Sequence, residues 1–221
     1  MRTLAIGDIH GYNNALEAVL EAARITADDS LIFLGDYIDR GPDSKAVVSR
    51  IIRLSQQQHV IALRGNHEVM ILSAREDPLQ FNLWCSYGGD ETLRSYEAGY
   101  RNDWQQLVPP DHWTFFQNTR RWFEIETHIF VHATLTPELD LADQPDYVLF
   151  WEQFSIQLRH KTGKTVVCGH TPQRSRLPAK GESSVCIDTG IYSGGWLTCL
   201  DVDSGIFWQA DESGTTRSSK F

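Results

Sequence analysis

The stretch Leu4-Ala5-Ile6-Gly7-Asp8-Ile9-His10-Gly11 opens the chain with an apolar run that passes directly into a loop bearing a carboxylate and an imidazole. The same order of apolar run and polar loop returns at residues 31–41 and again at residues 60–68. Each run has the length and composition of a buried strand. The three loops are therefore predicted at the carboxyl ends of neighbouring strands, where open α/β sheets bind their ligands.

Helices are predicted after each of these loops. The first begins near Asn13 or Asn14, the second follows Asp43 or Ser44, and both carry apolar residues at helical spacing. A third helix opens at Asn66 and runs to about residue 74. Three successive strand–loop–helix units imply a parallel sheet with right-handed crossovers.

The character of the chain changes between residues 76 and 121, where aromatic residues are mixed with Gly88-Gly89 and Pro109-Pro110. We interpret this segment as a helical insertion or lid over the site, with aromatic side chains that serve packing more than recognition.

The second half of the chain is predicted to contain mostly short strands. We expect strands at 123–125, 129–131, 165–168, 185–187, 196–200 and 206–208, and a helix from 147 to about 160. These strands form a second sheet or an antiparallel extension of the first. Residues 1–210 are then a single domain, and the polar residues 211–221 a flexible tail.

Composition limits the classes of function. The chain has 221 residues, 41% of them hydrophobic, and a mean hydropathy of −0.34 without a long apolar run, so no membrane span is expected. Its net charge of −9 shows no basic face for duplex nucleic acid. Four cysteines without CxxC spacing, and a strand that starts by residue 3, predict reduced thiols in a cytoplasmic protein. The oligomeric state is not encoded in any recognisable pattern.

Six side chains at five predicted strand ends are suited to hold divalent cations. Asp8 and His10 project to the same side of an extended segment, and the two oxygens of Asp36 can bridge two ions. The full set comprises Asp8, His10, Asp36, Asn66, His132 and His170. A single aspartate after a strand is more often a helix cap or turn residue. Six ligands together favour a two-metal site that catalyses hydrolysis, and bound cations would also reverse the local negative field for a phosphorylated substrate.

The blocks that carry these residues resemble a known family. Gly7–Gly11, Gly35–Gly41, Leu63-Arg64-Gly65-Asn66-His67-Glu68, Val131-His132 and Cys168-Gly169-His170-Thr171-Pro172 are similar to the signature blocks of calcineurin-like metallophosphoesterases. The resemblance is strongest to the phosphoprotein phosphatase branch, which includes protein Ser/Thr phosphatases and symmetrical dinucleoside tetraphosphatases. It extends from residue 3 to about residue 202.

The resemblance implies an α/β fold, a four-layer α/β/β/α sandwich with the aromatic-rich insertion added. It implies a first metal held by Asp8, His10 and Asp36, and a second held by Asp36, Asn66, His132 and His170. The two divalent ions would be Mn²⁺, or Fe, Zn or Mg. A hydroxide held by the two ions would attack phosphorus directly, without a phosphoenzyme.

Two further roles follow from the same blocks. His67 is the candidate general acid for the leaving group, and Asp39 resembles the family carboxylate that hydrogen-bonds this histidine. The alternative is that His67 only caps or packs at a helix start. Glu68, on the same helix, is expected to be structural.

Arg40, Arg64 and Asn66 are the candidates for binding the substrate phosphate. Arg40 is the direct clamp, whereas Arg64 either binds phosphate or pairs with a carboxylate to brace its loop. The chain departs from the family at Trp151-Glu152-Gln153-Phe154, where relatives place a second phosphate-binding arginine after a tryptophan. Arg159 is the one arginine between His132 and His170 and is a candidate substitute.

Three functions remain open on the sequence alone. The leading prediction is a dinuclear-metal phosphoric ester hydrolase of protein Ser/Thr phosphatase type, acting on phosphomonoesters. The second is a bis(5'-nucleosyl)-tetraphosphatase or other nucleotide phosphohydrolase. The third is a non-catalytic phosphopeptide-binding scaffold. The expected partner is thus a phosphorylated protein or a small phosphoester or nucleotide.

Overall fold

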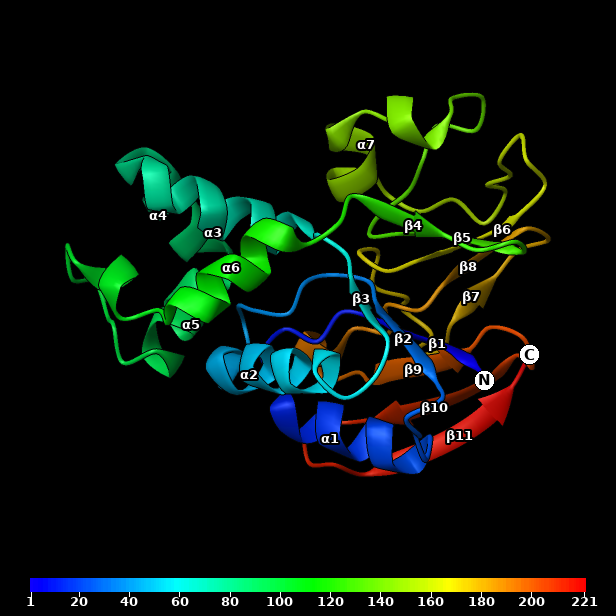
Figure 1. The fold of residues 1–221 in the computed structure, drawn as a ribbon, viewed down its shortest axis with the longest axis horizontal. Helices are drawn as coiled ribbons and strands as arrows, with labels where there is room; N and C mark the ends of the chain where they lie inside the picture. The colour runs from blue at the N-terminus through cyan, green and yellow to red at the C-terminus, as the bar shows by residue number, and fades with distance from the viewer.

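The computed structural model describes residues 1–221 as a sandwich of two β-sheets with helices on the outside (Figure 1). The six strands of the first sheet lie in the order β11 (Thr216–Lys220), β10 (Ile206–Ala210), β9 (Leu197–Asp201), β1 (Thr3–Ile6), β2 (Ser30–Phe33) and β3 (Val60–Ala62). The five strands of the second lie in the order β4 (Trp122–Glu124), β5 (His128–Val131), β6 (Thr165–Cys168), β8 (Ser184–Cys186) and β7 (Ala179–Lys180).

The predicted parallel core of the first sheet is confirmed. Strands β1, β2 and β3 pair in parallel, with α1 (Asn13–Ala22) and α2 (Ser44–Ser55) as the intervening helices. Strands β9 and β10 extend this sheet antiparallel on the other side of β1, whereas β6 and β8 form the parallel centre of the second sheet. Both predictions for the later strands, a second sheet and an extension of the first, therefore hold.

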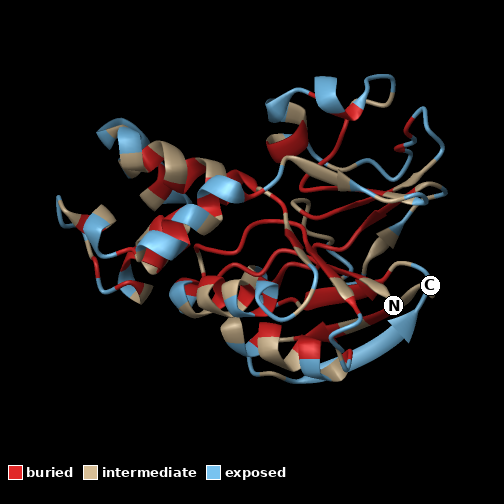
Figure 2. Ribbon diagram, in the orientation of Figure 1, coloured by how far each residue is buried: buried red, intermediate tan, exposed pale blue.

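Alternation along the strands builds three apolar layers. In β1, Leu4 and Ile6 face the core under α1 and α2, whereas Ala5 between them faces the second sheet. In β6, Val167 faces the first sheet and Val166 faces the outer core under α7 (Asp146–Trp151). These layers are the buried bands of Figure 2. The structure thus confirms the four-layer α/β/β/α arrangement.

The insertion is helical, as expected. Its elements are α3 (Asn66–Glu76), which begins in the site, then α4 (Pro78–Trp84), a π-helical turn (Cys85–Gly89), α5 (Asp90–Ser95), a 3₁₀ turn (Trp104–Gln106) and α6 (Pro110–Asn118). Trp84, Trp104, Trp113 and Phe116 are buried in the same core as the helices of the first sheet. Packing is therefore a main role of these aromatic side chains.

The predicted helix from residue 147 to about 160 is wrong in its length. Helix α7 ends at Trp151, and the next residues leave the helical conformation at Glu152. The carbonyl oxygen of Trp151 contacts the His170 ring at 3.1 Å, and the Phe154 N–H donates to Thr171 Oγ1 at 2.9 Å. The backbone after Trp151 is thus bound to a loop far away in the sequence, which local periodicity cannot reveal.

The prediction of a flexible tail at residues 211–221 is also wrong. Strand β11 pairs antiparallel with β10 along five residue pairs, from Ile206 with Lys220 to Ala210 with Thr216. The connecting turn is closed by Asp211 Oδ1, which accepts the N–H groups of Ser213 and Thr215. All five residues of β11 are exposed, so an edge strand here has no apolar alternation to predict it.

We expect the layer between the two sheets to carry much of the stability. Ile32 in β2 is fully buried in this layer, so Ile32→Ala should lower the free energy of unfolding by about 2–5 kcal/mol. Ser218→Ala, on the exposed edge strand β11, should change it by less than about 0.5 kcal/mol. Urea unfolding of both variants measures the difference, and a similar loss in both would contradict tight packing between the sheets.

Candidate metal centre

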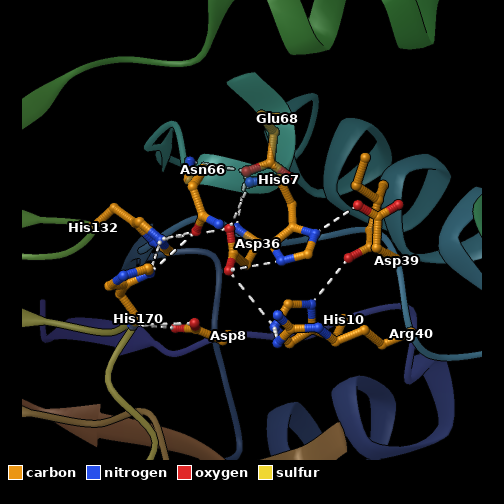
Figure 3. A network of polar contacts seen from close by, with 12 residues as sticks. Asp8, His10, Asp36, Asp39, Arg40, Asn66, His67, Glu68, His132 and His170 are labelled. Carbon is orange, nitrogen blue, oxygen red and sulfur yellow. Dashed lines mark hydrogen bonds and ion pairs between the residues drawn. The ribbon is translucent and has the colours of Figure 1, made fainter. Parts of the chain in front are cut away.

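Five strand ends bring the predicted site residues together. Asp8 and His10 follow β1, Asp36 and Asp39 follow β2, Asn66 and His67 follow β3, and His132 and His170 follow β5 and β6. All but His170 are buried, and His170 is half-buried. Figure 3 shows the side chains turned toward one another around Asp36. Both sheets therefore contribute to a single cluster.

Asp36 belongs to two groups of potential metal-binding atoms. In one group, its Oδ2 lies 3.6 Å from His10 Nε2 and 3.9 Å from His67 Nε2. In the other, its Oδ1 lies 3.5 Å from His132 Nε2, and His170 completes the set. The atoms of each group lie within 4.8 Å of one another. One carboxylate thus faces two positions suited to a cation.

Backbone carbonyls fix the orientation of three imidazoles. His132 Nδ1 lies 2.8 Å from the Leu34 oxygen and His10 Nδ1 lies 3.1 Å from the Ile38 oxygen. His170 is held the other way round, with Nε2 against the Trp151 oxygen. A carbonyl can only accept, so each outer nitrogen carries the proton and each inner nitrogen presents a lone pair. Metal-binding histidines are oriented in this way.

The side-chain atoms that face the centre of the cluster are mostly hydrogen-bond acceptors, and few donor hydrogens lie between them. His132 Nε2 and His170 Nδ1 lie 3.2 Å apart, although neither carries a hydrogen in this arrangement. Asn66 Oδ1 lies 3.0 Å from the first of them, and a half-turn of the amide would place its NH₂ group there instead. Burial lowers the pKa of His132 to about 4 and also lowers that of His10 and His170. Neutral nitrogens beside buried carboxylates are the chemistry that a divalent cation requires.

Asp8 lies at the edge of this set. Its two oxygens each accept the backbone N–H of His170 at 3.1 Å, and it belongs to neither group of three. A side chain on Gly169 would place its Cβ 2.1 Å from Asp8 Oδ1, so only glycine allows this close approach. Burial, together with the charges of Asp188 and Asp36, raises the pKa of Asp8 well above its usual value. A bound cation would relieve that crowding of carboxylates.

His67 lies on the opposite side of Asp36, at the start of α3. Its Nδ1 lies 2.6 Å from Asp39 Oδ2, and its buried Nε2 has no hydrogen-bond partner. Burial acts to lower the pKa of His67, but Asp36 and Asp39 outweigh burial and raise it. The structure therefore unites the predicted acid with its predicted carboxylate, and leaves one ring nitrogen facing the cluster (Figure 3).

The backbone is strained at the same positions. His10, Asp36, Asp39, Arg40 and His170 have positive φ angles between 49° and 73°. Non-glycine residues adopt this region at a free-energy cost, and such residues concentrate in functional sites. Glu68 offsets part of this cost because its carboxylate accepts the N–H groups of Asp36, Tyr37 and Gly65 at 2.9–3.0 Å. This is the structural role expected for Glu68.

The family follows from a comparison with known proteins. The model of the calcineurin-like phosphoesterase family matches residues 1–202. The chain belongs to this family. It is therefore a phosphoesterase, and the family implies divalent metal ions. The fold and the candidate ligands at the strand ends of this phosphoesterase agree with that membership.

Relatives place it in the phosphoprotein phosphatase branch. It is 31% identical over 210 residues to Serine/threonine-protein phosphatase 1 of Salmonella typhimurium, covering 87% of this chain and 88% of that protein. Serine/threonine-protein phosphatase 2 of Escherichia coli is 41% identical over 86 residues, 38% of this chain and 37% of that one.

Solved structures share the fold at lower identity. One assigned as a diadenosine tetraphosphatase superposes with a TM-score of 0.71 at 21% identity, covering 99% of this chain and 93% of that one. A serine/threonine phosphatase from Saccharomyces cerevisiae gives 0.64 at 15% identity, covering 100% and 80%.

The arginines of the phosphoesterase differ in how far they are free to bind phosphate. Arg40 lies in the cluster, with a guanidinium nitrogen 2.9 Å from His10 Nε2. Arg64 instead donates to Thr119 Oγ1 and to the carbonyl oxygens of Phe116, Gln117 and Thr119 at the end of α6. This geometry favours the alternative in which Arg64 braces its loop. Its partners are carbonyl oxygens and a hydroxyl, and not the carboxylate that was expected.

Arg159 does not reach the cluster. It pairs with Glu182, which precedes β8 and so lies at the amino end of that strand. The candidate ligand His170 follows the carboxyl end of the parallel neighbour β6, at the opposite edge of the sheet. Arg159 is therefore wrong as a second phosphate-binding arginine. Its position in the sequence gave no information on which end of the sheet it occupies.

Two residues near the cluster were missed in the sequence. Asp188 follows β8 and is buried beside Asp8, with Oδ2 unpartnered and a pKa raised to about 7 by burial. The strand-end pattern that suggested the other candidate ligands also applies to Asp188. Tyr192 lies with its ring 4.0 Å from the Arg40 guanidinium carbon and 5.1 Å from the His10 ring. Its loop offers no comparable signal.

Substitution of Asp36 tests whether one carboxylate serves two ions. Asp36→Asn keeps the size of the side chain but removes its charge from both groups of atoms, so we expect Mn²⁺ to bind weakly at both positions. His170→Ala touches only one group and should weaken one ion of the pair much more than the other. Calorimetric titration with Mn²⁺ gives the stoichiometry. Two ions bound by Asp36→Asn with unchanged affinity would contradict the bridging arrangement.

Proposed function

We propose that this phosphoesterase is a dinuclear metal-dependent protein Ser/Thr phosphatase that hydrolyses phosphomonoesters. The observation that supports the two-metal part of this proposal is the position of Asp36, whose Oδ2 lies 3.6 Å from His10 Nε2 while its Oδ1 lies 3.5 Å from His132 Nε2. The protein substrate is supported by the Salmonella relative, which matches most of both chains and is named a serine/threonine-protein phosphatase.

Six side chains are proposed to hold the ions. Asp8, His10 and Asp36 would hold the first, and Asp36, Asn66, His132 and His170 the second. The mixture of carboxylate, amide and imidazole ligands suits Mn²⁺, with Fe, Zn or Mg as alternatives. When bound, such a pair supplies an acidified water as nucleophile and neutralises charge on the phosphoryl group. No Ser or Cys nucleophile is then needed.

The side chains around the ions bind the substrate and move the proton. Arg40 presents its guanidinium at the cluster, where a planar donor fork can bind two phosphoryl oxygens. Tyr192 covers the Arg40 guanidinium and limits the directions in which it can turn. His67 faces the cluster with its unpartnered Nε2, from which it can donate a proton to the departing alkoxide. Asp39 holds the other nitrogen and stabilises the imidazolium form.

A second candidate acts on nucleotides. One structural relative is assigned as a diadenosine tetraphosphatase. The same phosphoryl chemistry in this protein would then act on a dinucleoside polyphosphate. The metal ligands cannot separate these substrates because both present a phosphoryl group. A non-catalytic scaffold is not supported, since all six candidate ligands and His67 are present. None of the helices combines the length and apolar character needed to cross a membrane, and the cytoplasmic location stays a prediction.

Parallel assays decide between the substrates. We expect Mn²⁺-dependent release of nitrophenol from p-nitrophenyl phosphate, and a higher kcat/KM on phosphoserine or phosphothreonine peptides than on diadenosine tetraphosphate. A phosphotyrosine peptide controls for residue preference. A higher kcat/KM on diadenosine tetraphosphate would favour the nucleotide hydrolase, and no metal-dependent turnover of any of these substrates would overturn the enzymatic proposal.

Replacement of His67 tests the acid role. His67→Asn should lower kcat on a phosphoserine peptide by about 10²–10⁴-fold, the usual contribution of a general acid. The loss on p-nitrophenyl phosphate should be much smaller, because the nitrophenolate leaves without a proton. Steady-state kinetics on the two substrates give the comparison. Equal losses would mean that His67 does not protonate the leaving group.

A further inference from the structure

The carboxylate of Asp39 is held by more than its contact with His67. Its Oδ2 accepts the indole N–H of Trp84 at 2.8 Å, on the same oxygen that contacts His67 Nδ1 at 2.6 Å. Its Oδ1 accepts the hydroxyl of Thr92 at 2.6 Å. Asp39 itself is fully buried. A buried carboxylate needs such donors, and here they also determine which way its oxygens point.

Both donors come from the insertion and not from the strand-end loops. Trp84 ends α4 and Thr92 lies in α5, 45 and 53 residues after Asp39 in the chain. Trp84 is fully buried and Thr92 nearly so, and neither is a candidate ligand of the metal centre. Their contacts with Asp39 are polar, whereas packing alone would have been served by apolar side chains.

The same insertion also fixes the backbone of the loop that carries Asp39. Thr92 Oγ1 accepts the Asp39 N–H at 2.9 Å, and the carbonyl oxygen of Gly88 accepts the Arg40 N–H at 3.1 Å. A Cβ on Gly88 would lie 2.8 Å from Arg40 Cγ, so the two segments are in close contact. Asp39 and Arg40 have left-handed φ angles that need such external support.

We propose that Trp84 and Thr92 are positioning residues for proton transfer, because they hold the Asp39 carboxylate in the orientation that His67 requires. This inference rests on the proposed acid role of His67. A rotation of the carboxylate would move Oδ2 away from Nδ1 and allow the imidazole to turn its Nε2 out of line with the leaving group. Misplacement by about 1 Å can reduce catalysis about 10²-fold. The insertion thereby becomes part of the acid's support in addition to its packing role.

Thr92→Val and Trp84→Phe each remove one donor and keep most of the side-chain volume. Each should lower kcat on a phosphoserine peptide by about 10–100-fold, while KM changes little, because the acid acts in the transition state. On p-nitrophenyl phosphate the loss should stay within about threefold, because no proton is required there. Thr92→Ser restores the hydroxyl and should recover most of the activity on the peptide.

Trp113→Phe is the matched control for the tryptophan. Trp113 lies in the same aromatic core, and its indole N–H donates at 3.0 Å to the Gln105 carbonyl oxygen, away from Asp39. It should change both substrates equally, if at all. Thermal unfolding of every variant shows whether the fold is intact, and the Thr92 pair decides the question if Trp84→Phe does not fold.

A double-variant cycle separates the inference from the function on which it rests. If His67 is the acid and Thr92 acts through it, Thr92→Val should cause no further selective loss in a His67→Asn background. A selective loss in His67→Asn, combined with equal losses on both substrates in Thr92→Val and Trp84→Phe, would overturn the positioning role alone. Equal losses on both substrates in His67→Asn would overturn the acid role, and the positioning role with it.

Discussion

The rest of the site depends on one constraint: unprotonated imidazole nitrogens lie against the buried carboxylate of Asp36. A buried carboxylate beside imidazole lone pairs is unfavourable unless donors or cations balance it. Here the His67 backbone N–H donates to Asp36 Oδ1 at 3.2 Å, and the carbonyl oxygens of Ile38 and Leu34 accept the far N–H groups of His10 and His132. The inner side is left electron-rich, which suits it to divalent ions.

This arrangement is maintained at a cost in backbone free energy. Positive φ angles at Asp36, Asp39 and Arg40 fall within five residues of one loop, and sites of this kind persist only where the surroundings over-determine them. Glu68 holds the loop from α3, and Thr92 and Gly88 hold it from the insertion. The loop therefore lowers the stability of the fold in order to place its side chains. The packed sheets and the insertion offset this free-energy cost.

The sequence reveals this centre well because strand ends are a local feature. An apolar run followed by a carboxylate or imidazole predicts both the strand and the place of its ligand, as at Asp36 and His170, and the same rule applied to Asp188 would have added it. Features that depend on distant partners were not predictable in this way. The role of Arg64 depends on its contacts with the end of α6. The residue at which α7 ends depends on contacts with the His170 loop. The exposed strand β11 has no apolar pattern.

The candidate ligands come from both sheets, which affects how the two sheets are joined. Asp8, His10 and Asp36 come from the first sheet and Asn66 from the helix after it, whereas His132 and His170 come from the second. The apolar layer between the sheets holds them together. Because the hydrophobic effect is non-directional, this layer does not fix how the carboxyl ends of the two sheets are aligned. A cation that contacts Asp36 and His132 would link the edges directly, and any ligand that binds only the folded chain adds to its stability. The lone pairs that would hold the ions would then also fix the alignment of the two sheets.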